Sequence, residues 1–133
     1  MALILLDTDV FSYFFKRDRR AALYQPYLLQ GQPSLSFQTL AEVRCWALVR
    51  GWGESRKNNL EETLRRYLVL PYDESMSQRW AAISARRRQI GNEIGCGDAW
   101  IAATALRHDA TLISHNAKDF AGIPGLKLIS HGS

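Results

Sequence analysis

The sequence has few of the residues that build disulfide-stabilised or zinc-stabilised domains. Two of its 133 residues are cysteines, Cys45 and Cys96, and neither belongs to a CxxC or Cys/His spacing. This argues against a disulfide framework and against a structural zinc site. None of the three histidines has a second histidine at ligand spacing. We interpret Cys45, which follows a helical pattern beside Trp46, as a small buried hydrophobic residue.

Long hydrophobic runs are also missing. No stretch approaches the ~18 apolar residues that cross a bilayer, and Asp7 interrupts the first apolar run too early for a signal peptide. The expectation is a soluble cytoplasmic protein without membrane contact. The balance of 17 basic against 13 acidic residues gives a net charge of +4, which permits a polyanionic partner without requiring one.

Short strand-like runs alternate with helical patterns along a single domain, residues 1–133. The strand-like runs lie at 3–6, 35–37, 67–72, 110–114 and 126–130. Helical patterns cover 8–15, 20–30, 39–50, 54–67, 73–89 and 97–108. Strands separated by helices indicate βαβ crossovers, so the sequence predicts an α/β fold, a three-layer α/β/α sandwich with a mainly parallel central sheet. Ligand sites are then expected outside the carboxyl ends of the strands.

Four acidic residues occupy comparable places in four of these units. Asp7 follows the first strand, Glu42 lies one turn into the helix after 35–37, Asp98 opens an alanine-rich helix, and Asp119 follows 110–114. If these helix starts meet at one edge of the sheet, the carboxylates share a small volume, which is unfavourable unless protons or cations neutralise them. Ligands that are all oxygen favour Mg²⁺, with Mn²⁺ as the alternative. The matching chemistry is in-line attack of water on a phosphodiester.

Each acid also has a purely structural interpretation. Thr39-x-x-Glu42 has the form of a capping box, and Asn116-x-x-Asp119 can be interpreted in the same way. Asp98 would itself be a helix N-cap, and the first acid would merely end a strand. For any one of these acids, a structural role is commoner than a catalytic or metal-binding one. Taken together, the structural roles must explain acids at strand ends in four separate units, which weakens that interpretation.

Four sequence blocks resemble a known family. LILLDTDVFS, TLAEVRCWA, GDAWIAATAL and LISHNAKDF resemble, in order and spacing, the blocks of a PIN domain. The chain length, together with DxxIAAxA and the NxxDF ending, resembles more narrowly a VapC-type toxin ribonuclease. The resemblance runs from Leu3 to about Leu128. It implies a PIN-like fold and a Mg²⁺-dependent endoribonuclease that hydrolyses phosphodiester bonds in structured RNA.

The resemblance also implies roles for the four acids. Asp7 and Asp98 would be the main metal ligands. Glu42 would position a metal-bound water or a second ion, and Asp119 would complete the acidic cluster.

Neighbouring positions match the family less uniformly. Thr8 and Asn116 match positions expected to orient the acids or to contact substrate phosphate. Ser114 stands where the family more often has threonine, and Gly97 replaces a residue that is often polar. Asp9 stands where asparagine is common, and we expect it to cap the first helix rather than to bind metal.

The same resemblance implies partners. Proteins of the VapC type usually form homodimers and are held inactive by a co-encoded VapB-like antitoxin. RNA is the implied substrate, for example transfer RNA or a loop of ribosomal RNA.

Basic and aromatic residues are compatible with RNA but have simpler interpretations. Arg86–Arg88 would either grip phosphates or form a solvated helix face, of which the second is the commoner case. We interpret Trp46, Trp80 and Trp100 as core or dimer-interface residues because they fall within helical patterns. Trp52, between two glycines, is the tryptophan we expect to be exposed.

Rival functions remain open from the sequence. Asp7-Thr8-Asp9 has the DxD form of haloacid-dehalogenase-like phosphatases, in which the first aspartate is a nucleophile, but a convincing downstream acidic pair is missing. A PIN-fold nuclease that processes RNA without a toxin role is a second alternative. A PIN-fold module that binds RNA or protein without cutting is a third. A small antitoxin reading frame beside the gene would favour the toxin.

Overall fold

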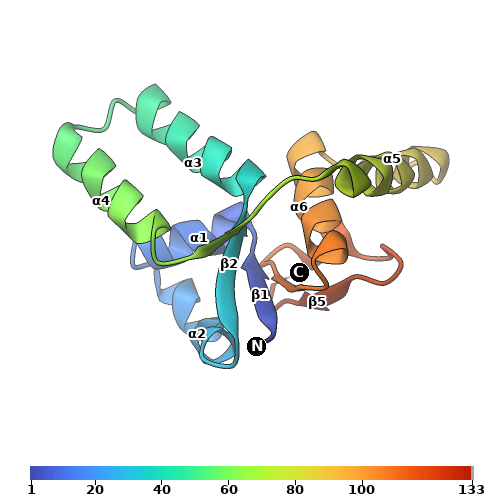
Figure 1. Cartoon of the computed structure of the whole chain (residues 1–133), viewed down its shortest axis with the longest axis horizontal. Helices are drawn as coiled ribbons and strands as arrows, with labels where there is room; N and C mark the ends of the chain where they lie inside the picture. The colour runs from blue at the N-terminus through green and yellow to red at the C-terminus, as the bar shows by residue number, and fades with distance from the viewer. Residues whose placement is uncertain (133) are drawn as a thin grey trace.

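A five-stranded parallel sheet forms the centre of the computed structural model, which describes residues 1–132 (Figure 1). The strands are β1 (Leu3–Leu6), β2 (Gln32–Ser36), β3 (Leu68–Leu70), β4 (Thr111–Ile113) and β5 (Lys127–Ile129). They lie in the order β3-β2-β1-β4-β5, and every neighbouring pair is parallel. The predicted parallel α/β sheet is therefore confirmed.

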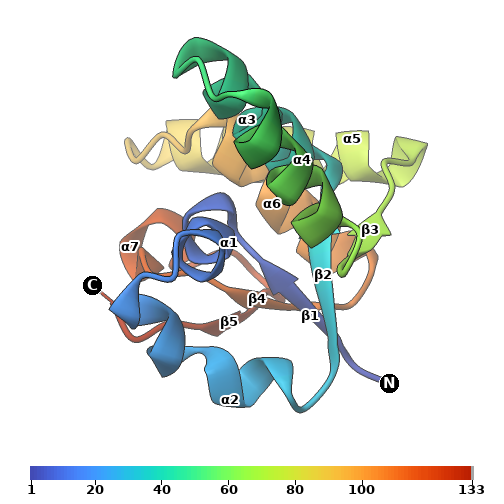
Figure 2. The ribbon, with the colours of Figure 1, turned by 90° about the vertical axis from the view of Figure 1, so that its left-hand side faces the viewer.

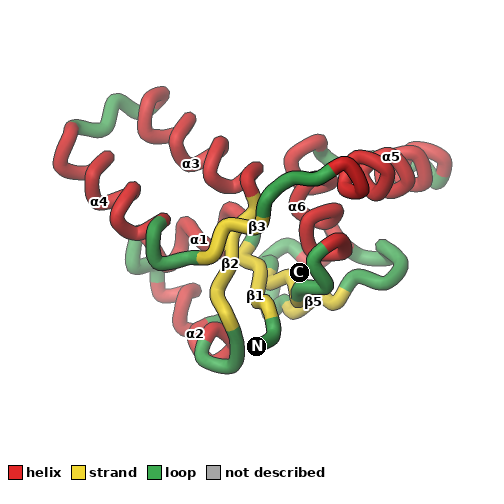
Figure 3. Tube along the Cα trace, viewed as in Figure 1, coloured by secondary structure: helices red, strands yellow, loops and turns green. Residues whose placement is uncertain are grey.

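Helices connect all the strands (Figure 3). They are α1 (Thr8–Phe15), the 3₁₀ helix η1 (Arg19–Leu23), α2 (Gln25–Leu28), α3 (Phe37–Val49), α4 (Glu54–Leu64), α5 (Glu74–Gln89), α6 (Cys96–Arg107) and α7 (Ala117–Phe120). Among residues 1–132 no helix is long and apolar enough to cross a membrane.

Two hydrophobic cores, one on each face of the sheet, make the three layers. Ile4 and Leu6 of β1 point into the first core, which α1, α3 and α4 cover, whereas Leu5 points into the second, which α5, α6 and α7 cover. Successive residues of a strand face opposite sides, so the fully apolar β1 run is what a strand buried on both faces requires. The two helical groups flank the sheet in Figure 1; Figure 2 looks from the side of the first group, with α3 and α4 in front of α5 and α6.

Two predicted boundaries were wrong in the first half of the chain. The second strand begins at Gln32 and passes through Pro33, rather than starting at Leu35, because residues 32–34 pair with residues 3–5 of β1. The single helix expected over 20–30 is divided into η1 and α2. Asp18 starts η1 by accepting the backbone N–H of Arg20 at 2.9 Å.

Two side chains differ in solvent exposure from what the sequence predicts. Cys45 is exposed, because α3 buries the face that carries Val43 and Ala47 instead. Trp52 is half-buried and stacks on Phe15, with ring centroids 5.7 Å apart. The flanking glycines turn the chain between α3 and α4, and that turn folds the indole back onto α1.

The strand order reverses direction beside β1. The chain moves from β1 outward to β2 and β3 and then returns to the other side of β1 to form β4 and β5. A crevice opens at such a switch point outside the carboxyl ends of the strands, and it is the usual ligand site of parallel sheets. Asp7 follows β1 and Ser114 follows β4 at this point.

Candidate active site

Asp7 is held at the switch point by both the sheet and the first helix. Its backbone N–H donates to the carbonyl of Ile113 at 3.0 Å, and its Oδ1 accepts the N–H of Val10 at 2.8 Å. Asp7 is therefore the N-cap of α1. The expectation that Asp9 caps this helix was wrong, because α1 begins at Thr8 and Asp9 lies within its first turn.

The carboxyl group of Asp7 is buried, with 5% of the residue exposed. Burial raises its pKa from 3.8 to about 7, and repulsion from Asp9 and Asp98 adds to the increase. Hydrogen bonds with the Ser114 side chain and the Val10 N–H lower the pKa without cancelling the cost of burial. Folding thus places a carboxylate where negative charge is poorly solvated.

Asp98 lies in the first turn of α6, where its pKa is also perturbed. Burial raises the pKa from 3.8 to about 6, and repulsion from Asp119, Glu42 and Asp9 acts in the same direction. The N-cap position belongs to Gly95, so the interpretation of Asp98 as an N-cap was wrong. These three acids therefore lie close enough to the start of α6 for their charges to act on Asp98.

Glu42 lies in the second turn of α3, not in its cap. The helix begins at Phe37 because the Ser36 hydroxyl accepts the N–H of Thr39 at 3.1 Å. The proposed capping box was therefore wrong. Oε1 of Glu42 instead accepts a hydrogen bond from Gln38 Nε2 at 2.8 Å.

Gly97 makes room for this arrangement at the contact between α3 and α6. A Cβ atom at position 97 would stand 2.8 Å from Glu42 Oε1 and 2.9 Å from Gln38 Nε2. Both distances are too short for non-bonded carbon contacts. The lack of a side chain at this position therefore lets the Glu42 carboxylate approach the start of α6.

Asp119 and Asn116 occupy the short helix that follows β4. Asn116 stands at the N-cap position of α7 but makes no side-chain cap; its Nδ2 donates to Asp9 Oδ2 at 3.2 Å. The Ser114 hydroxyl accepts the Asn116 N–H at 3.0 Å. Ser114 thus orders the α7 loop and also contacts Asp7, a double role that the sequence did not reveal.

Thr8 lies beneath the acids rather than facing outward. It is buried, and its hydroxyl pairs with that of Thr39 at 3.0 Å, joining the first turns of α1 and α3. Thr39 Oγ1 also accepts from the Ser36 hydroxyl at 3.4 Å. This position fits a role in orienting Asp7 and Glu42.

Arg87 is a positioning residue that sequence reasoning missed. Only 4% of it is exposed, and its guanidinium donates to the backbone carbonyls of Asp119 at 2.7 Å and of Ala121 and Asn92 at 3.3 Å. The solvated-face interpretation of the arginine run therefore holds for Arg86 and Arg88 but not for Arg87. Its charge also lowers the pKa of Asp98.

A hollow of about 320 Å³ opens beside these groups. It is lined by Arg87, Asn92, Glu93, Ile94, Gly95, Asp98, Lys118 and Asp119. The lining combines carboxylates with two basic groups, and this combination suits a phosphate bridged by a cation.

The donor set fits a hard divalent cation. It consists of carboxylate oxygens, and the raised pKa values of Asp7 and Asp98 mark negative charge that the protein leaves incompletely balanced. Within residues 1–132, no group of three or more His, Cys, Asp or Glu side chains already stands in position to hold a metal ion. Mg²⁺ needs only one or two protein carboxylates because it keeps several waters, so a pair such as Asp7 and Asp98 would be enough to hold it.

Comparison with known proteins places this geometry in a family. A PIN domain model matches residues 4–126. The VapC ribonuclease Y4jK of Sinorhizobium fredii is 31% identical over 96% of both chains, and ribonuclease VapC4 of Mycobacterium tuberculosis is 28% identical over 95% of both. The VapBC-1 structure from nontypeable Haemophilus influenzae is similar with a TM-score of 0.82 and 28% identity, covering 96% of this chain and 97% of its counterpart. The chain therefore belongs to the PIN-domain family.

Proposed function

We propose that this protein is a metal-dependent endoribonuclease and that it acts as the toxin of a toxin–antitoxin pair. The observation that carries the proposal is the pair of buried or half-buried carboxylates Asp7 and Asp98, whose pKa values are raised to about 7 and about 6 and of which Asp98 repels the charge of Asp7. Perturbed carboxylates in a cleft are typical of catalytic and metal sites. Relatives that span nearly the whole chain are named VapC ribonucleases, which supports RNA as the substrate.

Asp7 and Asp98 are the proposed ligands of Mg²⁺, with Mn²⁺ as the alternative. When bound, such an ion stabilises charge on a phosphate oxygen and makes a nearby water more acidic. Glu42 Oε1 is occupied by Gln38, which leaves Oε2 to accept a proton from the attacking water. Asp119, whose carbonyl is held by Arg87, completes the negative side of the hollow.

The proposal includes protein partners. We propose a homodimer and a VapB-like antitoxin that blocks the acidic site. Similar structures include the VapBC-1 structure and a FitAB structure bound to a DNA fragment. Large apolar side chains are exposed at the end of α3 and on the edge strand β3: Leu48, Val49, Leu68 and Val69.

Two exposed free cysteines suit a reducing compartment such as the cytoplasm.

The test is cleavage of a mixed pool of structured RNAs by the purified protein, with Mg²⁺ or with EDTA. The informative variant is Asp98→Asn, because Asp98 does not cap α6 and the change removes charge while keeping shape. Asp109→Asn is the matched control: Asp109 is exposed and has a φ of 53°, which asparagine tolerates.

We expect wild type and Asp109→Asn to cut RNA with Mg²⁺, and Asp98→Asn to lose at least ~100-fold in rate. Loss of cleavage in EDTA completes the expected pattern. If all three proteins bind RNA without cutting it, the chain is a binding module and the proposal fails. Equal cutting by all three would mean that Asp98 is structural.

A further inference from the structure

Six side chains from three helix ends form a surface that the proposed acidic site does not use. We call it the basic–aromatic tract: Phe15, Lys16, Trp46, Arg50, Trp52 and Arg56. The residues come from the end of α1, from the second half of α3 and its end, and from the turn before α4 with its first helical turn.

Within the tract, each positive charge lies over an aromatic ring. Lys16 Nζ is 5.7 Å and Arg50 Cζ 5.1 Å from the ring centre of Trp46. Arg56 Cζ lies 4.0 Å from the ring centre of Trp52, whose other neighbour is Phe15. Cation–π contacts of about 0.5–1 kcal/mol each restrain these flexible side chains. The indoles are half-buried, so the charges rest on a fixed surface.

These charges are not neutralised by acids. Lys16, Arg50 and Arg56 are exposed, and within residues 1–132 none of them lies within 4.0 Å of a carboxylate oxygen. Other exposed cations of the chain, such as Arg44 and Arg107, do have carboxylate partners. Unpaired, restrained cations are what a polyanion needs for binding at low entropic cost.

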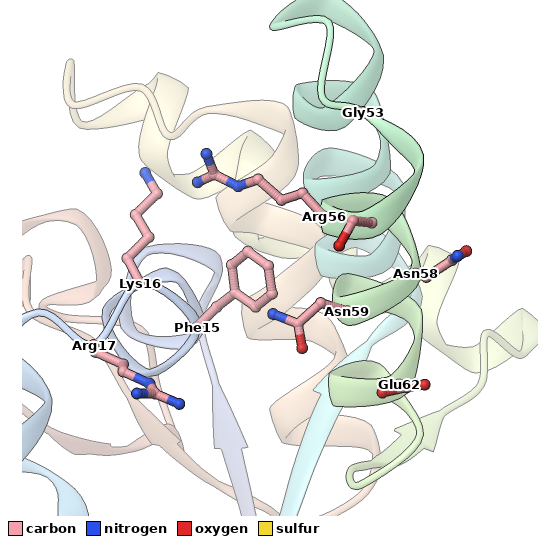
Figure 4. Close-up of a pocket in the computed structure, with 9 residues that line it drawn as sticks. Phe15, Lys16, Arg17, Gly53, Arg56, Asn58, Asn59 and Glu62 are labelled. Carbon is pink, nitrogen blue, oxygen red and sulfur yellow. The ribbon is translucent and has the colours of Figure 1, made fainter.

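Three of the tract residues, Phe15, Lys16 and Arg56, line a hollow of about 910 Å³ between α1 and α4. In Figure 4, Lys16 and Arg56 extend from the two helices toward the same side, and Phe15 lies between the helices. Asn58 and Asn59 add amide groups to the wall. The hollow therefore presents the cations Lys16, Arg17 and Arg56 and two amides around Phe15, together with the carboxylate of Glu62.

The tract is continuous with the acidic site along two helices. On α3, Glu42, Trp46 and Arg50 are spaced four residues apart and share one face, which places Arg50 about 12 Å from Glu42 along the helix axis. On α1, Asp9 and Lys16 are seven residues apart and also share a face. At ~3.4 Å per stacked nucleotide, this length corresponds to three or four nucleotides.

We propose that the basic–aromatic tract binds the phosphate backbone of the RNA strand on one side of the cleaved bond, without regard to base sequence. The proposal rests on the proposed nuclease function and specifies how its substrate is held. Two of the three cations are arginines, whose planar guanidinium can lie flat on a ring and direct its N–H edge at a phosphate. The rings themselves are occupied by these cations, so phosphate contact is favoured over base stacking.

The test compares two double variants that remove equal charge. Arg50→Gln/Arg56→Gln removes the tract arginines, and Arg65→Gln/Arg66→Gln removes two exposed arginines just beyond the other end of α4. Binding of a labelled single-stranded RNA of ~20 nucleotides is measured by anisotropy in EDTA, where no cleavage is expected. Thermal unfolding verifies that each variant is folded, and Arg50→Lys/Arg56→Lys tests whether charge alone suffices.

We expect the tract variant to bind the 20-mer about tenfold more weakly than wild type at ~0.1 M salt, and to lose about 1.4 from the slope of log affinity against log salt. The control should lose much less.

Equal RNA binding by the tract variant and its control would overturn the proposal. So would a variant that keeps RNA binding but loses binding of a poly-glutamate peptide, because the tract would then be a protein-docking surface. Because binding is measured without cleavage, the two proposals can fail separately. If wild type never cuts RNA but the tract variant binds RNA more weakly than wild type, only the nuclease proposal is refuted.

Discussion

The clearest prediction concerns Asp7, whose ionisation should oppose folding when no metal is present. Its folded-state pKa of about 7 exceeds the ordinary value of 3.8, so the folded protein binds this proton more tightly than the unfolded chain. The free energy of unfolding should therefore fall as the pH rises from about 4 to about 7. A difference of about three pKa units corresponds to roughly 4 kcal/mol.

Replacing Asp7 by asparagine should remove this cost and keep the cap of α1, because asparagine caps a helix about as well as aspartate. In EDTA at pH 8, the free energy of unfolding of Asp7→Asn should exceed that of wild type by up to about 4 kcal/mol. At pH 4 the two proteins should differ by about 0.5 kcal/mol, since ionisation then costs little in the wild type.

Urea denaturation at pH 4 and pH 8 measures this difference. Asp109→Asn serves as the control, because it makes the same chemical change at an exposed residue. Adding Mg²⁺ at pH 8 should stabilise the wild type and leave Asp7→Asn almost unchanged. An Asp7→Asn variant no more stable than wild type at pH 8 would refute the reasoning that burial makes this carboxylate costly.

Three further predictions concern the support of the site. Arg87→Met should lower the free energy of unfolding by about 3 kcal/mol, because the buried guanidinium and its hydrogen bonds to three backbone carbonyls are lost. Arg86→Met should change it by less than ~0.5 kcal/mol, and urea denaturation measures both. Gly97→Ala should displace the Glu42 carboxylate and slow RNA cleavage about 10- to 100-fold, with little loss of thermal stability. Gly53→Ala is the control, because a Cβ atom at position 53 meets open space, and it should cut RNA at the wild-type rate. Cleavage abolished by EDTA should return with Mn²⁺, and activity that persists in EDTA would contradict metal dependence.

The sheet could be predicted from the sequence because its central strand, β1, is a continuous apolar run and the later strand-like runs alternate with helical patterns. Both β1 and α1 lie where the hydrophobic pattern placed them. Strand β2 is harder, since Pro33 and the polar Gln32 and Ser34 hide the first part of the strand. The parallel pairing of residues 32–34 with β1 sets where the strand begins. The local sequence does not reveal which residues pair.

The candidate acids could be found as a pattern, but their local roles could not. Asp7 and Asp9 flank Thr8, and either residue type would suit the N-cap of a helix. The backbone hydrogen bond from Asp7 N–H to the Ile113 carbonyl keeps Asp7 in the sheet, so the helix begins after it and Asp7 is the N-cap. Arg87 was hidden for a similar reason. Its partners are backbone carbonyls, two of which lie more than thirty residues away in sequence, and any residue type at those positions would offer the same acceptors.

The place of β1 in the middle of the sheet has a consequence for the time at which the protein becomes active. The ribosome makes β1 first, but β1 pairs with β4, with residue 5 opposite residue 112. The crevice between them therefore cannot form until most of the chain has left the ribosome. Distant pairings of this kind also form slowly. A chain still being synthesised would therefore carry Asp7 and Glu42 without Asp98 and Asp119. It would be harmless to the RNA around it, including the ribosome that makes it.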